Sequence, residues 1–109
     1  MAITYKVLAQ SAPSATTNTD VYTVGSGKQA TISTITIANR AASSATYRIA
    51  IRVAGSALSN EEYIAYDASI TANNSTFITI GVTLAATDVI TVYASTADLS
   101  FNAFGSEIA

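Results

Sequence analysis

Three carboxylates, Glu61, Glu62 and Asp67, form the only local cluster of acidic residues in the sequence. Two carboxylates that flank a glycosidic bond could hydrolyse it, one as the acid and the other as the nucleophile or base. Residues 61–66, however, have a strand pattern, and adjacent strand residues point to opposite faces, so Glu61 and Glu62 cannot flank one bond. Asp67 follows that strand and is expected to cap a turn. We therefore predict no catalytic carboxylate pair and no enzymatic activity.

The chain contains neither cysteine nor histidine. It therefore has no thiolate nucleophile, no disulfide and no Cys- or His-ligated metal, and it lacks the usual general base near neutral pH. Its aspartates are dispersed and form no calcium-binding loop, although a structural ion held between loops is an alternative. Gly25 and Gly27 precede Lys28 without the spacing of a phosphate-binding loop, and they predict a tight turn. No catalytic residue, metal or cofactor is predicted.

Arg48 and Arg52 lie on one face of a predicted strand, about 13 Å apart at the usual rise per residue. Arginine is enriched in protein interfaces, where its planar guanidinium forms bidentate ion pairs. The alternative is that each arginine forms a surface ion pair with a glutamate of the next strand. Tyr63 and Tyr66 are expected on opposite faces of their strand, one in the core and the other exposed. The candidate interface residues are therefore Arg48, Arg52, Tyr63 and Tyr66.

The 109 residues carry little charge: five basic and seven acidic side chains give a net charge of −2 and a charged fraction of 11%. An average domain has about 25% charged residues. Serine and threonine occupy 29 positions and alanine 21, so most polar positions are neutral hydroxyls. Five basic residues are a poor footprint for nucleic acid or an anionic membrane, and the apolar runs are too short to span a bilayer. This composition predicts burial against other protein chains and no nucleic-acid or membrane partner.

Strand patterns dominate the sequence. Thr, Ile, Val and Tyr alternate with small or polar residues, and turn residues separate the runs. In residues 46–53 the apolar residues from Tyr47 to Val53 share one face of a strand, whereas a helix would scatter them. The predicted strands span residues 3–10, 20–24, 29–38, 46–53, 61–66, 76–82, 89–94 and 99–104.

Two irregularities interrupt this pattern. In residues 29–38 the apolar phase slips between Ile32 and Ile35, which predicts a β-bulge near residues 33–34. Residues 11–19 contain the only proline, Pro13, and are predicted to be a loop or an extended arm. Residues 55–60 are the only stretch that could hold a helical turn.

About eight short, evenly spaced strands and no long helix predict an all-β fold. The expected architecture is a single antiparallel β-sandwich over residues 1–109, of jelly-roll or immunoglobulin-like topology. A closed eight-stranded barrel is the structural alternative. Residues 1–19 would supply an N-terminal strand plus an arm that reaches a neighbouring subunit.

Six segments that cover nearly the full length carry a resemblance to a known family: 5–10 (YKVLAQ), 35–40 (ITIANR), 47–52 (YRIAIR), 63–67 (YIAYD), 84–89 (LAATDV) and 99–108 (LSFNAFGSEI). In these segments the chain resembles small virion structural proteins of tailed bacteriophages, especially cyanobacterial and marine phages. None of the segments is a catalytic motif. The resemblance therefore implies membership of a particle rather than an activity, and it assigns no role to any single residue.

These observations favour a non-enzymatic phage virion structural protein located in the virion, and within that class a capsid decoration or cement protein. The expected partners are other virion proteins, either the major capsid protein or neck and tail proteins, and further copies of the chain in a homo-oligomer. The alternative is a neck, tail, baseplate or fibre component. A receptor- or carbohydrate-binding module of that kind would need an exposed aromatic or polar groove.

Overall fold

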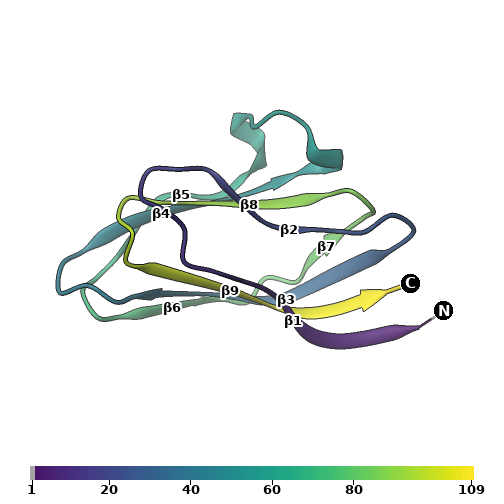
Figure 1. Ribbon diagram of the computed structural model, residues 1–109, viewed down its shortest axis with the longest axis horizontal. Coiled ribbons are helices and arrows are strands. Elements are labelled where there is room, and N and C mark those ends of the chain that lie inside the picture. The colour runs from purple at the N-terminus through teal and green to yellow at the C-terminus, as the bar shows by residue number, and fades with distance from the viewer. Residues whose placement is uncertain (1) are drawn as a thin grey trace.

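The alternating sequence pattern forms nine strands and two short 3-10 turns in the computed structural model, which describes residues 2–109 (Figure 1). All strand pairs are antiparallel. The predicted all-β class is confirmed. The elements are β1 (Ile3–Ser11), β2 (Thr19–Thr23), β3 (Gln29–Asn39), β4 (Ala45–Arg52), η1 (Val53–Gly55), η2 (Asn60–Glu62), β5 (Tyr63–Ile70), β6 (Ser75–Ile78), β7 (Val82–Leu84), β8 (Val89–Ala94) and β9 (Leu99–Ile108).

The strands form two layers of a sandwich (Figure 1). Sheet A has the order β1-β9-β3-β6, with β7 also paired to β3, and sheet B has the order β2-β8-β4-β5. The pairs β4–β5, β3–β6/β7, β2–β8 and β1–β9 nest like one long hairpin, which wraps around so that β9 also pairs with β3 and β8 with β4.

This connectivity is that of a jelly roll, with β6 and β7 as two pieces of one strand. It decides among the predicted topologies. An immunoglobulin-like sandwich pairs its first two strands in one sheet, whereas β1 and β2 lie in different sheets here. The strands also form two separate sheets rather than one closed barrel.

The apolar core lies between the two sheets. Tyr47 from β4 and Phe101 from β9 meet edge to face across it, with ring centroids 6.4 Å apart. Val53 was expected on the same inner face as Tyr47 but is 65% exposed, because β4 ends at Arg52 and Val53 begins η1. The largest fully buried side chains are Val24, Ile32, Ile37, Ile49, Ile70, Ile90, Val92 and Leu99.

The predicted bulge in β3 is confirmed. The pairing with β9 shifts between Ile32, which faces Gly105, and Thr34, which faces Phe104, so Ser33 is the extra residue. The extra residue lets Ile32 and Ile35 both point into the core, where both are buried. The phase slip in the sequence therefore marks a bend of the strand and not a change of face.

Three predicted strands have clearly different bounds. The strand predicted over 99–104 continues to Ile108, and its last residues pair with the start of β1. The strand predicted over 76–82 is divided, because the chain turns at Gly81, whose φ of 60° is a left-handed conformation that glycine adopts without a steric penalty. The strand predicted over 61–66 begins only at Tyr63 and continues to Ile70, because Glu61 and Glu62 belong to η2.

The N-terminal segment is built into the sandwich. β1 pairs with β9 along its length, and Ala9 is buried in the core. Residues 12–18 cross from sheet A to sheet B beyond the end of β1, and the amide of Thr16 donates to the carbonyl oxygen of Ala94 at 2.8 Å. The region for which an arm was expected is thus a connection between the sheets.

Candidate interaction surfaces

Arg48 leaves β4 on the outer face of sheet B and lies between two aromatic rings. Its guanidinium carbon is 4.3 Å from the ring centroids of both Tyr66, on β5, and Tyr93, on β8. Its Nε lies 2.7 Å from Oδ1 of Asp67, and this hydrogen bond raises the pKa of Arg48 above its ordinary value. A cation between two rings is attracted by both π-faces. The side chain is therefore held in place by its own chain.

Arg52, the second predicted interface arginine, fastens the segment that follows β4. Its guanidinium donates to the carbonyl oxygens of Gly55 at 3.0 Å and Ser56 at 2.8 Å. It also forms an ion pair with Asp20 at 2.9 Å, and Asp20 accepts a second hydrogen bond from Thr91 at 2.7 Å. Both arginines thus have acidic partners, but these are aspartates of other strands and not the glutamates of the next strand.

Tyr63 and Tyr66 contact each other, contrary to the expectation that they point to opposite faces. Their rings meet edge to face with centroids 4.8 Å apart, and neither is buried in the core. The cause is the irregular pairing of β5 with β4, which shifts register twice, with Asp67 in a left-handed conformation at φ of 50°. With Asn60 the two rings line a shallow hollow on the outer face of sheet B.

Two of the three clustered carboxylates, Glu62 and Asp67, have structural roles, whereas Glu61 is exposed. Glu62 accepts hydrogen bonds from the Ser56 hydroxyl at 2.7 Å and the Ser59 amide at 2.9 Å, and the Ser56 bond is the main cause that lowers the pKa of Glu62. Asp88 accepts from the amides of Ala54 and Ala85. Asp67 lies within β5 rather than after it. Within residues 2–109 no three acidic side chains come together as a metal site would require.

The outer face of sheet A has a different composition. Ile3, Tyr5 and Val7 alternate along β1 and are exposed, with Tyr5 81% exposed, and Phe77 on β6 is 70% exposed. They share the outer face because Val7 pairs with Phe104, which alternates with the core residues of β9, and Phe77 pairs with Thr36, which alternates with those of β3. Sequence reasoning missed this surface, although the apolar alternation in residues 3–7 is visible.

Within the described residues the strands of sheet A themselves place no charged side chain on this outer face, but Arg40, directly after β3, donates to the Ser100 hydroxyl at one end of it. The charged residues of these strands are Lys6 and Glu107, which point to the inner side. There Lys6 Nζ lies 2.8 Å from Glu107, and the Tyr22 hydroxyl of sheet B donates to the same carboxylate. The Lys6 bond is the main cause that lowers the pKa of Glu107, whereas burial raises the pKa of Tyr22.

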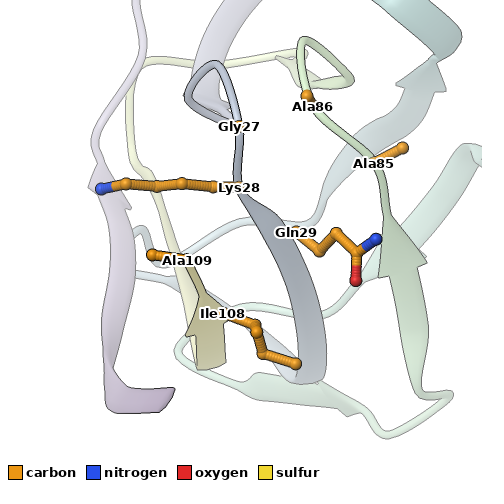
Figure 2. Close-up of a pocket in the computed structure, with 7 residues that line it drawn as sticks. All are labelled: Gly27, Lys28, Gln29, Ala85, Ala86, Ile108 and Ala109. Carbon is orange, nitrogen blue, oxygen red and sulfur yellow. The ribbon is translucent and has the colours of Figure 1, made fainter. Parts of the chain in front are cut away.

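A second hollow lies at the end of the sandwich where β3 begins (Figure 2). Figure 2 shows the Lys28 side chain, just before β3, and the Gln29 side chain, at the start of β3, pointing in opposite directions. Apart from Lys28, its lining is small or uncharged. Lys28 is therefore the only titratable side chain in its lining. The hollow is lined by Gly27, Lys28, Gln29, Ala85, Ala86, Ile108 and Ala109.

These features define the class of this protein as a jelly-roll β-sandwich whose two outer faces differ in charge, with ion pairs on sheet B and mainly apolar and hydroxyl side chains on sheet A. Comparison with protein-family models, curated proteins and solved structures gives no match. Residues 2–109 form no helix with the length and hydropathy of a membrane span.

Proposed function

We propose that this chain is a non-enzymatic structural protein of a tailed-phage virion, and that it decorates or cements the capsid. The observation that carries the proposal is the outer face of sheet A, where exposed apolar side chains lie among hydroxyl groups and Arg40, beside Ser100, is the one charged side chain found in contact with it among residues 2–109. Exposed apolar side chains gathered in one row, such as Ile3, Tyr5 and Val7 on β1, are the kind of surface that marks protein–protein contact sites. The resemblance of six segments to small virion proteins supplies the kind of assembly.

The shape of the molecule suits a many-copy role. The sandwich measures 45 × 28 × 21 Å, so its flat outer face can lie on a regular protein lattice. Such a contact can be weak in each copy, because linked contacts multiply the overall affinity. The expected partners are the major capsid protein and further copies of this chain.

Quantitative mass spectrometry of purified virions tests the proposal. The copy number of this chain is measured relative to the major capsid protein. A ratio near parity supports decoration or cementing. A dozen or so copies would move the chain to the neck, tail, baseplate or fibre, and absence from the particle would overturn the virion assignment.

A receptor- or carbohydrate-binding role is the second candidate, and the hollow beside Tyr63 and Tyr66 favours it. Sugars pack against exposed aromatic rings, and Asn60 offers a polar group at the same place. A glycan array probed with the intact chain and with Tyr66→Ala decides this. Binding that the substitution abolishes would support the candidate, and an array without any bound glycan would reject it.

A further inference from the structure

The two sheets have four edges. Three of them are interrupted, and the fourth, β1, also shifts register once, between Val7 and Ala9. In sheet B, β2 shifts register between Asp20 and Tyr22, and β5 shifts twice against β4. In sheet A, the edge formed by β6 and β7 is broken between Ile78 and Val82. Short strands, bulges and breaks are the devices that keep an open edge from pairing with another chain.

The fourth edge is regular over its first half. From Ile3 to Val7, five consecutive residues of β1 pair with β9 without a register shift, and all five are exposed. No strand within residues 2–109 pairs with the other side of β1. Residues 12–18 leave β1 beyond Ser11 and do not cover this half, so β1 lies at the margin of the molecule in Figure 1. Its outward backbone groups are thus free to pair with a further strand.

A charged residue on an edge strand usually guards it, and β1 carries one, Lys6. Here the ammonium group lies 2.8 Å from Glu107 of the neighbouring strand, so its charge is compensated within the same chain. The exposed outer side chains of this half are Ile3, Tyr5 and Val7. Charge therefore does not oppose the approach of a second strand.

We propose that a second copy of this chain pairs with β1 in an antiparallel arrangement, with a two-fold axis at Tyr5. In this register Ile3 lies opposite Val7 of the second copy, Tyr5 lies opposite Tyr5, and Lys6 lies opposite Thr4. Apolar side chains then meet apolar side chains, and the two lysines do not face each other. The segment is self-complementary, as a two-fold interface requires.

The inference deepens the proposed function and rests on it, since it names the contact between copies in a many-copy assembly. It leaves the rest of the outer face of sheet A free, including Phe77 at the opposite edge. Two paired sandwiches would thus present the outer faces of two copies of sheet A joined in one continuous sheet.

Disulfide trapping tests both the contact and its register, because the chain has no cysteine of its own. In the proposed pair the two Cβ atoms at position 5 are about 5 Å apart, so Tyr5→Cys should form a disulfide-linked dimer on mild oxidation. Position 3 lies roughly 14 Å from its own copy, since four residues separate it from its partner, so Ile3→Cys alone should stay monomeric. A mixture of Ile3→Cys and Val7→Cys should cross-link.

Two further variants keep the test independent of the loss of the tyrosine ring. Phe77→Cys, on the same sheet face at the opposite edge, is the matched control and should not cross-link. Tyr5→Lys places two like charges opposite each other and should shift the sedimentation coefficient of the chain from dimer to monomer, with an unchanged circular dichroism spectrum.

Cross-linking of Phe77→Cys in place of Tyr5→Cys, or of Ile3→Cys with itself, would overturn the inference. A wild-type chain that sediments as a monomer, together with a Tyr5→Cys variant that forms no disulfide, would do the same. These results are distinct from the virion measurement. If the chain pairs at Tyr5 but is absent from virions, the dimer stands and the virion function is rejected. If it is a many-copy virion protein that does not pair at Tyr5, the virion function stands and the dimer is rejected.

Discussion

The two outer faces of the sandwich are formed by similar strands, but their side chains differ in bonding and exposure. On sheet B, Arg48 and Arg52 are satisfied by aspartates, tyrosine rings and backbone carbonyls of the same chain. On sheet A, Tyr5 and Phe77 project from the strands and stay largely exposed. Side chains of a type that is common in interfaces, such as arginine, can therefore be occupied by bonds within their own chain and not be available to a partner. A surface that is available to another chain is recognised by exposed side chains without partners in their own chain.

The comparison has an energetic counterpart. Substitutions on the outer face of sheet B remove intramolecular bonds and should lower the free energy of unfolding. Substitutions on the outer face of sheet A remove exposed groups and should affect association instead. The variants below separate the two faces, beginning with one that disturbs the framework beneath sheet A.

Gly105→Ala should have the largest effect on stability. A Cβ atom at Gly105 would lie 1.9 Å from the carbonyl oxygen of Thr31 and 3.1 Å from Cα of Ile32, so β3 and β9 would have to move apart. We expect a loss of about 3 kcal/mol or more in the free energy of unfolding, measured by urea denaturation.

Gly25→Ala is the control for this substitution. The nearest atom to its added Cβ is a side-chain carbon of Lys28 at 3.4 Å, which can move. The control should cost far less than Gly105→Ala. Equal losses for the two variants would show that backbone contact between β3 and β9 does not limit sheet A.

Arg52→Ala should cost about 2 kcal/mol, because it removes hydrogen bonds to Asp20, Gly55 and Ser56. Arg52→Lys should recover only part of the loss, since an ammonium group cannot reproduce the planar fork. Urea denaturation measures both, and limited proteolysis should show faster cleavage within residues 53–60.

Arg40→Ala is the matched control beside sheet A. Arg40 donates to the exposed Ser100 hydroxyl and the carbonyl of Ala97, and its loss should cost about 0.5 kcal/mol. If Arg40→Ala were as destabilising as Arg52→Ala, the bonds within the outer face of sheet B would not contribute more to stability than those beside sheet A.

Glu107→Gln should make the stability less dependent on acid pH. The bond to Lys6 holds the pKa of Glu107 below its ordinary value of 4.5, so the carboxylate stabilises the fold above that pH and loses its contribution as the pH falls through the folded pKa. At pH 7 the variant should be about 1 kcal/mol less stable than the wild type, by the loss of a charged hydrogen bond.

The two urea midpoints should converge on acidification. Glu61→Gln, at an exposed position, is the control and should follow the wild type at neutral pH. A constant difference between Glu107→Gln and the wild type at every acid pH would contradict the linkage.

The strands and the bulge could be predicted because they depend on local alternation. The slip between Ile32 and Ile35 is written in the sequence, and so is the turn at residues 25–27. The jelly-roll connectivity could not be chosen over the immunoglobulin-like one, because the pairing of β1 with β9 joins the two ends of the chain. The alternation of apolar and polar residues shows which residues share a face of a strand, but it does not show which strand lies beside it.

The surface residues were harder to interpret for the same reason. Tyr63 and Tyr66 were expected on opposite faces because strict alternation was assumed, and the register shifts of β5 break it. In the sequence, the apolar row of Ile3, Tyr5 and Val7 has the same pattern as a strand face that packs into the core. Only the pairing with β9 reveals that this row lies outside the core. Which row is buried is decided by tertiary packing.

The smallest effect on stability is expected for Phe77→Ser. This variant separates the contribution of the outer face of sheet A to binding from its contribution to stability. The ring is 70% exposed, so its loss should change the free energy of unfolding by less than about 0.5 kcal/mol. Under the proposed function the same substitution should lower binding to particles that lack this chain, measured by co-sedimentation, because it removes the largest apolar group at that edge of the outer face.

Tyr66→Ser is the matched change on sheet B. It removes one of the two rings that hold Arg48 and should cost about 1 kcal/mol in stability while particle binding is retained. The two variants thus give opposite pairs of results if sheet A is the docking face. If Tyr66→Ser lost particle binding and Phe77→Ser kept it, the preformed stack around Arg48 would be the contact surface, and the interface residues predicted from the sequence would be the ones that meet the partner.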